Sequence, residues 1–155
     1  MDEPEFEAFY RATADRLRTY LYRVCGDRRL AEDLAQEGYY RFLRSGFSST
    51  EDEERARYLF RIGSNLLKDH WAGAKKIASL PSLEPETASP ADRLDLHNAL
   101  GALKRPERQM LWLAYAEGYS HSQIAGVLGV KPASVRVLLF RAKARLVRLL
   151  QGDQT

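Results

Sequence analysis

Apolar residues recur at steps of three and four along most of the chain, which is the pattern of helices that each bury one face. No stretch of useful length alternates apolar and polar residues, so the pattern predicts no strands. In the first half it predicts three helices, over about residues 5–25, 28–44 and 51–72. Their apolar positions are Phe6, Phe9, Tyr10, Leu17, Leu21 and Val24 in the first helix, Leu30, Leu34, Ala35, Phe42 and Leu43 in the second, and Leu59, Phe60, Gly63, Leu66, Leu67 and Trp71 in the third.

The ends of these helices carry matching signals. Gly26 and Gly46 stop the first and second helices. Asp27 is placed to cap the second helix with its carboxylate. Thr50 and Glu53 have the spacing of a capping box, which predicts the start of the third helix. The first half is therefore predicted to form one three-helix domain.

The second half opens on residues 73–91, which contain Pro81, Pro85 and Pro90 and show no helical period, as is typical of a linker. Further helices are predicted through Leu94, Leu100 and Leu103, from Pro106 to Gly118, from Ser120 to Gly129, and onward from Pro132 with an apolar face of Val135, Leu138 or Leu139, Ala142, Leu146 and Leu149 or Leu150. The predicted fold class is all-α, with two small helical domains joined by a flexible linker and a helix-turn-helix in the second. The predicted boundaries are 1–73, 74–92 for the linker, and 93–155.

Charge changes this picture, because the formal net charge of +3 hides a segregated distribution. Residues 1–76 carry 14 basic and 14 acidic side chains, and residues 77–98 have a net charge of −3. Residues 99–155 carry nine basic against three acidic side chains, a net charge of +6. The last third alone therefore has the charge balance of a nucleic-acid-binding module.

Residues 120–145 have the spacing of a helix-turn-helix, in which the second helix enters the DNA major groove. An ordinary helical hairpin with a solvated charged face is the alternative. No Asp or Glu occurs between Glu117 and Asp153, whereas a merely solvated face usually mixes both signs, so DNA binding is favoured. The basic residues that lie off the apolar stripe are Arg136, Arg141, Lys143, Arg145 and Arg148.

A second group of basic residues, within residues 55–76, is interleaved with aromatic ones. This composition suits single-stranded or melted nucleic acid, whose bases stack on aromatic rings while cations follow the phosphates. Taken alone, aromatics at helical spacing are more often core residues than stacking platforms. The group consists of Arg55, Arg57, Arg61, Lys68, Lys75 and Lys76 with Tyr58, Phe60, His70 and Trp71.

Asp33 and Glu37 are four residues apart and share a helix face with Gln36, which favours a basic protein partner. A metal pair or an acid–base pair is the alternative, but the three histidines are scattered and none lies on this segment. With no phosphate loop or catalytic triad either, we expect no enzyme activity, no metal, no cofactor and no small-molecule substrate.

Cys25 is the single cysteine, which excludes a disulfide framework within the chain and a multi-thiolate zinc site. It is compatible with a reducing cytosol, and we interpret it as a small buried apolar residue. No window approaches the roughly 20 apolar residues of a membrane span. We therefore expect a cytoplasmic protein without membrane insertion.

Four stretches in this order resemble the extracytoplasmic-function (ECF) sigma factors, group IV of the bacterial primary-sigma family. They are Phe6–Tyr10 (FEAFY), Ala31–Glu37 (AEDLAQE), Tyr58–Asp69 (YLFRIGSNLLKD), and Gly118–Ala125 (GYSHSQIA) continued by Val135–Leu146 (VRVLLFRAKARL). The resemblance spans nearly the whole chain and includes the linker. It implies an alternative sigma factor that binds core RNA polymerase and directs promoter-specific transcription initiation, and it implies an anti-sigma factor as a regulator.

The resemblance also implies site residues. The first domain corresponds to sigma region 2, which binds core polymerase and melts and holds the −10 element, with a loop at about 45–50 that captures a flipped base. The second corresponds to sigma region 4, which reads the −35 element as duplex. The implied polymerase-binding residues are Asp33, Gln36 and Glu37; the −10 residues are Arg61, Asn65, Lys68, Asp69, Trp71, Lys75 and Lys76; the −35 residues are Lys131, Ser134, Arg136, Val137, Phe140, Arg141 and Lys143.

Some positions depart from the family pattern. Lys131, Val137 and Leu138 differ from its usual residues, so the −35 specificity cannot be carried over; Val137 or Phe140 is suited to a thymine methyl group. Gly38 replaces a usual apolar residue at a cost of roughly 1 kcal/mol of helix propensity, for which close packing is one reason. The alternative function is a duplex-binding transcription regulator whose first domain senses a signal or dimerises, although no heptad seam supports a dimer.

Overall fold

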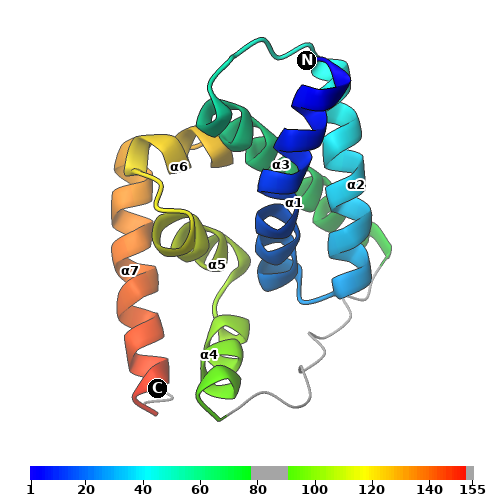
Figure 1. Ribbon diagram of the computed structural model, residues 1–155. Helices are drawn as coiled ribbons and strands as arrows, with labels where there is room; N and C mark the ends of the chain where they lie inside the picture. Colours follow the sequence, from blue (N-terminus) through cyan, green and yellow to red (C-terminus); the bar gives the residue numbers. More distant parts are fainter. Residues whose placement is uncertain (78–90, 153–155) are drawn as a thin grey trace. The chain divides into compact units, whose positions relative to one another are not determined.

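The computed structural model describes residues 1–77 and 91–152 of the chain. The chain divides into two compact units, Met1–Leu80 and Pro81–Thr155 (Figure 1). Most of the predicted linker lies outside the described residues. The helix before it continues to Ile77, and the next begins at Ala91. The described residues contain helices and no strand, which confirms the predicted all-α class.

Unit 1 consists of α1 (Glu3–Cys25), α2 (Arg28–Ser45) and α3 (Asp52–Ile77), and each of these helices packs against the other two. The predicted ends of α1 and α2 are confirmed. Gly26 takes the left-handed conformation with φ 75° and ends α1. The Asp27 carboxylate accepts a hydrogen bond of 3.1 Å from the Leu30 N–H and caps α2.

The core of unit 1 includes polar groups that the apolar period did not predict. Tyr39 is buried on α2, and its hydroxyl lies 2.6 Å from that of Thr13, which donates to the Phe9 carbonyl. Burial raises the pKa of Tyr39, although the hydrogen bond with Thr13 opposes the shift. A second buried pair, Tyr20 and Ser64, joins α1 to α3 at 2.7 Å. The hydroxyl pairs satisfy polar atoms that burial would otherwise leave unpaired.

Several expectations for unit 1 were wrong. Leu43 was predicted on the apolar face of α2 but is 50% exposed, because Tyr39 and Phe42 fill that side of the core. Cys25 is half-buried rather than buried, since it lies at the end of α1. The capping box of Thr50 does not start the third helix: α3 begins at Asp52, and the Ser49 hydroxyl makes the local hydrogen bonds, accepting from the Glu51 N–H at 3.1 Å and donating to the Glu54 carboxylate.

Unit 2 consists of α4 (Ala91–Ala102), α5 (Arg105–Leu111), a π-helical turn η1 (Trp112–Ala116), α6 (His121–Leu128) and α7 (Pro132–Leu150). The predicted helix from Pro106 is thus interrupted by a π turn before Gly118, which takes φ 72°. Of the two leucines between which the sequence left the apolar face of α7 open, Leu139 is buried and Leu138 is half-buried. The core of the unit is built from Leu100, Leu103, Met110, Leu111, Leu113, Ile124, Val127, Val135, Leu139 and Ala142.

Within the described ranges no single helix is long and apolar enough to cross a membrane. Only α6 and α7 taken together reach that length and composition, and they are bent by 102° at their junction.

Two buried glycines in unit 1 differ in the space around them. A Cβ atom at Gly38 would lie 3.9 Å from the side chains of Leu17 and Leu59, an ordinary contact distance. A Cβ at Gly63 would lie 3.2 Å from Leu17, where the neighbour must move. Close packing therefore does not require a glycine at position 38, contrary to the expectation from sequence, whereas α1 does approach α3 closely at Gly63.

We expect Gly38→Ala to raise the stability of unit 1 by about 1 kcal/mol, because alanine removes backbone freedom from the unfolded chain and its methyl group fits the space present. Hydrogen exchange of the core amides of α1–α3 measures this without interference from unit 2. Gly63→Ala is the matched control and should gain less than Gly38→Ala or lose stability. A Gly38→Ala protein no more protected than the wild type would show that this space is not available.

Candidate nucleic-acid interface

One face of α3 carries exposed polar and basic residues at helical spacing. Arg61, Asn65 and Lys68 are all exposed, and their steps of four and three place them on a single stripe, called here the α3 stripe. Tyr58, half-buried, lies three residues before Arg61 and continues the stripe toward the start of the helix. The opposite face of α3 is buried in unit 1 through Ala56, Leu59, Phe60, Ser64, Leu66 and Leu67.

The segment of residues 46–51 joins α2 to α3 and brings an aromatic ring to the end of the α3 stripe. Gly46 turns the chain with φ 68°, and the Ser45 hydroxyl accepts from the Phe47 N–H at 3.2 Å. The Phe47 ring stacks on Tyr58 with centroids 4.3 Å apart and planes 3° from parallel. Phe47 remains 37% exposed. Sequence reasoning placed this segment but missed Phe47; a lone aromatic after a glycine turn was the available signal.

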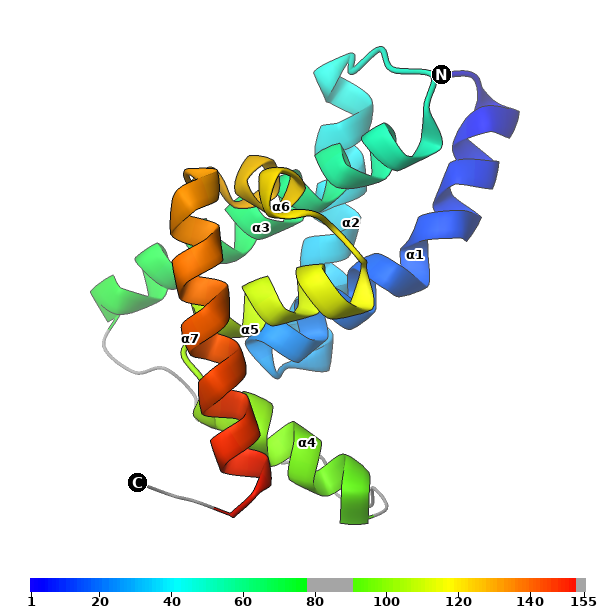
Figure 2. The same cartoon turned by 90° about the vertical axis from the view of Figure 1, so that its left-hand side faces the viewer.

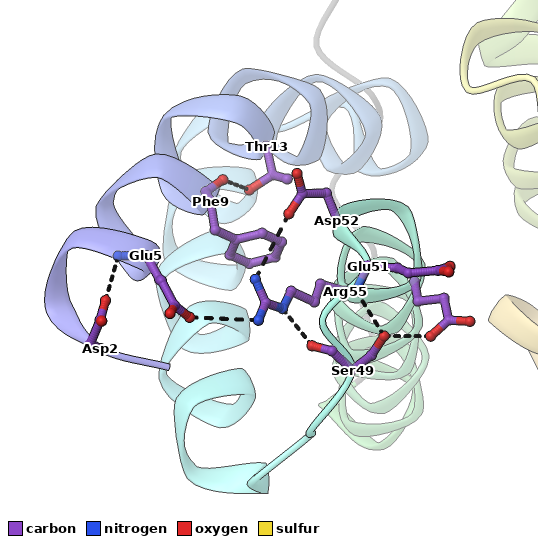
Figure 3. Close-up of polar contacts among 9 residues, drawn as sticks. Asp2, Glu5, Phe9, Thr13, Ser49, Glu51, Asp52 and Arg55 are labelled. Atoms are coloured by element: carbon purple, nitrogen blue, oxygen red, sulfur yellow. Dashed lines mark hydrogen bonds and ion pairs between the residues drawn. The ribbon is translucent and has the colours of Figure 1, made fainter.

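The other end of the 46–51 segment is held by Arg55, as Figure 3 shows. The Arg55 Nε donates to the Ser49 carbonyl at 2.7 Å. The remaining guanidinium nitrogens lie 3.7 Å from the Glu5 carboxylate on α1 and 3.8 Å from the Asp52 carboxylate on α3. The side chain is only 14% exposed. Arg55, which the sequence grouped with the residues suited to nucleic acid, therefore makes internal contacts.

The other predicted −10 residues lie toward the C-terminal end of α3. Asp69 is exposed one turn after Asn65 and borders the α3 stripe. Trp71 is half-buried. Lys75 and Lys76 belong to the end of α3, and their side chains lie outside the described part of the structure.

On α2, the acidic face predicted for a protein partner is exposed. Asp33, Gln36 and Glu37 are all exposed, and Asp33 makes no hydrogen bond or ion pair with the described residues. Glu37 pairs with Arg41 at 3.1 Å, and the Gln36 amide donates to Glu32 at 3.5 Å. Asp33 thus presents its whole charge to the surroundings, whereas that of Glu37 is partly neutralised. No group of acidic, His or Cys side chains among the described residues could hold a metal ion.

In unit 2, α6 and α7 form a helix-turn-helix. Their axes are bent by 102°, within the range of that motif, and Figure 2 shows α6 crossing the N-terminal end of α7. The predicted capping box is confirmed: the Ser120 hydroxyl accepts from the Gln123 N–H at 3.2 Å, and the Gln123 side chain accepts from the Ser120 N–H at 3.0 Å. Gly129 ends α6 with φ 70°, and Pro132 opens α7.

The face of α7 away from the core combines basic and apolar side chains. Phe140 is 75% exposed and Val137 is 48% exposed, although burial in a core is the usual place for such residues. Arg136 and Arg141 flank them and are exposed. Since Phe140 contributes little to the core, its apolar surface is free to contact another molecule.

The arginines of α7 differ from those of unit 1 in their partners. Within the described residues, Arg136, Arg141, Arg145 and Arg148 form no ion pair. Their positive charge is therefore not neutralised internally, which suits a phosphate backbone.

The other predicted −35 residues lie at the start and in the middle of α7. Lys131 and Ser134 are exposed at the N-terminal end of the helix. The Lys143 ammonium lies 5.8 Å from the ring centroid of Tyr115 in η1, a residue that sequence reasoning did not single out and that is 62% exposed.

Comparison with known proteins identifies these two units. The family model of Sigma-70 region 2 matches residues 9–77, and that of Sigma-70 region 4 matches residues 93–146. Both models describe parts of sigma-70 proteins, transcription-initiation factors that have no catalytic activity of their own. Both units of the chain therefore match regions of sigma-70 proteins.

Individual relatives show which group of sigma factors the chain resembles. The chain is 30% identical to the ECF RNA polymerase sigma factor SigL of Mycobacterium tuberculosis, over 93% of this chain and 88% of the relative. It is 31% identical to SigE of Mycolicibacterium smegmatis and 30% identical to BldN of Streptomyces coelicolor, over 92% and 96% of this chain. It spans only 60% and 61% of those two relatives. The chain belongs to the ECF sigma factors.

A solved structure supports the fold. The sigma factor RpoE of Bartonella quintana, crystallised with the anti-sigma factor NepR, matches 98% of this chain and 100% of its own with a TM-score of 0.82. The two sequences are 21% identical, so this likeness bears on the fold.

Proposed function

We propose that this chain is an alternative sigma factor that binds core RNA polymerase and directs promoter-specific transcription initiation. One observation carries the proposal: two separate units each present a surface suited to a different form of DNA, an aromatic and basic one on α3 and a basic helix-turn-helix on α7. We assign sigma region 2 to residues 1–73 and sigma region 4 to residues 93–155, with 74–92 as the linker.

The α3 stripe and the 46–51 segment are proposed to hold the non-template strand of the −10 element after melting. Arg61 and Lys68 are placed to follow its phosphates, and Asn65 to hydrogen-bond a base. The exposed face of Phe47 offers a ring for a base that has left the stack. Trp71, Lys75 and Lys76 extend the same contact along α3, with Asp69 at its border.

The helix α7 is proposed to read the −35 element in the major groove. Arg136 and Arg141 are suited to phosphates or to guanine, and Lys131, Ser134 and Lys143 to the backbone beside the groove. Val137 and Phe140 offer apolar contacts of the kind that recognise a thymine methyl group.

The acidic face of α2 is proposed to dock on core polymerase, because its exposed carboxylates fit a basic partner surface. The Bartonella quintana neighbour was crystallised with an anti-sigma factor, which supports an anti-sigma partner for this chain also. The proposed function places the protein in the bacterial cytoplasm, where it acts without cofactor, metal or catalytic chemistry of its own.

Transcription tests the proposal directly. Core polymerase from the same bacterium, incubated with the chain and fragments of its genome, should start RNA synthesis at a small set of sites that share two elements. Sequencing of the RNA 5′ ends identifies those sites. Core polymerase alone is the control. Absence of new start sites on every fragment, or tight binding of the free protein to a palindrome, would instead favour a duplex-binding regulator.

We expect Asp33→Ala combined with Gln36→Ala to weaken binding to core polymerase by roughly tenfold, because two of the three exposed side chains of the docking face are removed. Gel filtration of the full chain with core enzyme measures co-elution. Glu7→Ala, which removes an exposed acid of α1 that pairs with Arg11, is the matched control and should co-elute as the wild type does. Unchanged co-elution of the double variant would contradict the assignment of this face.

We expect replacement of one thymine by uracil in a −35 duplex to weaken binding about fourfold, since a buried methyl group contributes about 0.8 kcal/mol. Phe140→Ala should bind the two duplexes equally. Arg141→Ala is the matched variant: it should weaken both duplexes and preserve the fourfold difference, because a phosphate contact is indifferent to the methyl group. Fluorescence anisotropy measures the affinities. A Phe140→Ala protein that still discriminates would exclude Phe140 as the reader.

A further inference from the structure

We propose that Arg55 is a positioning residue that holds the 46–51 segment in the conformation that selects a promoter base. This inference rests on the proposed function, because that function assigns the segment to the melted −10 strand. Arg55 itself is not proposed to touch DNA, since its side chain is only 14% exposed and its guanidinium points toward Glu5, Ser49 and Asp52 (Figure 3).

The contacts of Arg55 differ in how much they contribute to holding the segment. The hydrogen bond from its Nε to the Ser49 carbonyl is 2.7 Å long and partly buried. The distances to the carboxylates of Glu5 and Asp52 are 3.7 Å and 3.8 Å, and both acids are well exposed. Exposed ion pairs of that length contribute little, so the bond to the Ser49 carbonyl dominates. The two carboxylates mainly orient the guanidinium toward the segment.

The segment is anchored to α3 through two of its residues, Phe47 and Ser49. Phe47 is held by stacking on Tyr58, and Ser49 by its carbonyl on Arg55. Tyr58 and Arg55 are three residues apart on α3, about one helical turn. Between the anchors lies only Ser48, which is exposed. The Ser49 hydroxyl also donates to the exposed Glu54 carboxylate. Arg55 makes the part-buried hydrogen bond to the Ser49 backbone. Loss of Arg55 therefore leaves Ser49 attached to α3 through its side chain alone, and the backbone next to Phe47 is less constrained.

The contacts of the segment with α3 control the position of the Phe47 ring. Tyr58 lies at the end of the α3 stripe, so the stack sets where the exposed face of Phe47 stands relative to Arg61 and Asn65. A base bound there would meet a ring of defined position. Loss of the Arg55 anchor would broaden that position and reduce selection among bases, while contacts of the stripe with phosphates would remain.

Lysine cannot replace Arg55 in this role. The guanidinium has a planar fork that donates to the carbonyl through Nε while its terminal nitrogens face two carboxylates. A lysine ammonium has a single nitrogen at the end of a flexible stem and does not reproduce this arrangement. Arg55→Lys thus keeps the charge and removes the geometry.

The experiment uses the full chain bound to core polymerase and single-stranded DNA of the −10 element, with each of the four bases placed in turn at every position. For the wild type, the affinity ratio between preferred and other bases should be large at the position bound by the 46–51 segment. Arg55→Lys and Arg55→Met should lower that ratio about fivefold or more, the smaller end of what one stacked base contributes, and leave the ratios elsewhere unchanged. Arg11→Lys, an exposed cation on α1, is the matched control.

The outcomes separate the two proposals. Unchanged ratios in both Arg55 variants would overturn the positioning role, and so would a uniform loss of affinity at all positions, which is what mere destabilisation of unit 1 produces. A wild-type complex without any base preference in single-stranded DNA would overturn the proposed −10 recognition, and this inference with it. Should Arg55→Met fail to fold, Arg55→Lys still decides, because it retains the charge and the aliphatic stem.

Discussion

Each proposed DNA-binding helix of this protein also contributes to the core of its unit. The need to bury one face of the helix therefore decides which residues can contact DNA. In small three- or four-helix units, α3 and α7 must bury one stripe, so the residues available to DNA are those on the remaining face. Burial of Leu59 and Phe60 turns Arg61 and Asn65 outward, and burial of Leu139 and Ala142 does the same for Phe140 and Arg141. A shift of the apolar stripe by one residue would rotate each helix by about 100° and turn part of its DNA-facing side toward the core.

The two units differ in how their positive charges are paired. In unit 1 many arginines are neutralised by nearby acids, as Arg18 is by Glu32 at 2.8 Å and Arg41 by Glu37 at 3.1 Å. Within the described part of α7, the arginines have no such acidic partners. The net charge of +3 is therefore a poor guide to DNA binding. Under the proposed function, a larger enzyme delivers the chain to promoters. The chain then does not need strong attraction of its own, because two weak sites act together on that scaffold.

Local signals predicted most of the secondary structure because caps and glycine turns act over a few residues. Asp27, Ser120 and Gly129 lie where the sequence placed helix ends. Contacts between distant residues were not predictable in this way. The hydroxyl pair of Thr13 and Tyr39 joins residues 26 apart, and helical periodicity does not tell which distant side chains meet. The π turn at residues 112–116 likewise breaks a helix that no proline or glycine interrupts.

Residue type and helical period were enough to predict the helical class, the helix-turn-helix and the segregation of charge. Asn65 was assigned through the family resemblance, and the way the 46–51 segment is held became visible only in the folded unit. The sequence grouped Arg55 with the cations suited to nucleic acid, but packing of α1 against α3 brings Glu5 to its guanidinium, and the 46–51 segment brings the Ser49 carbonyl. Whether a cation faces solvent or an internal carbonyl depends on contacts between helices, which a local pattern does not contain.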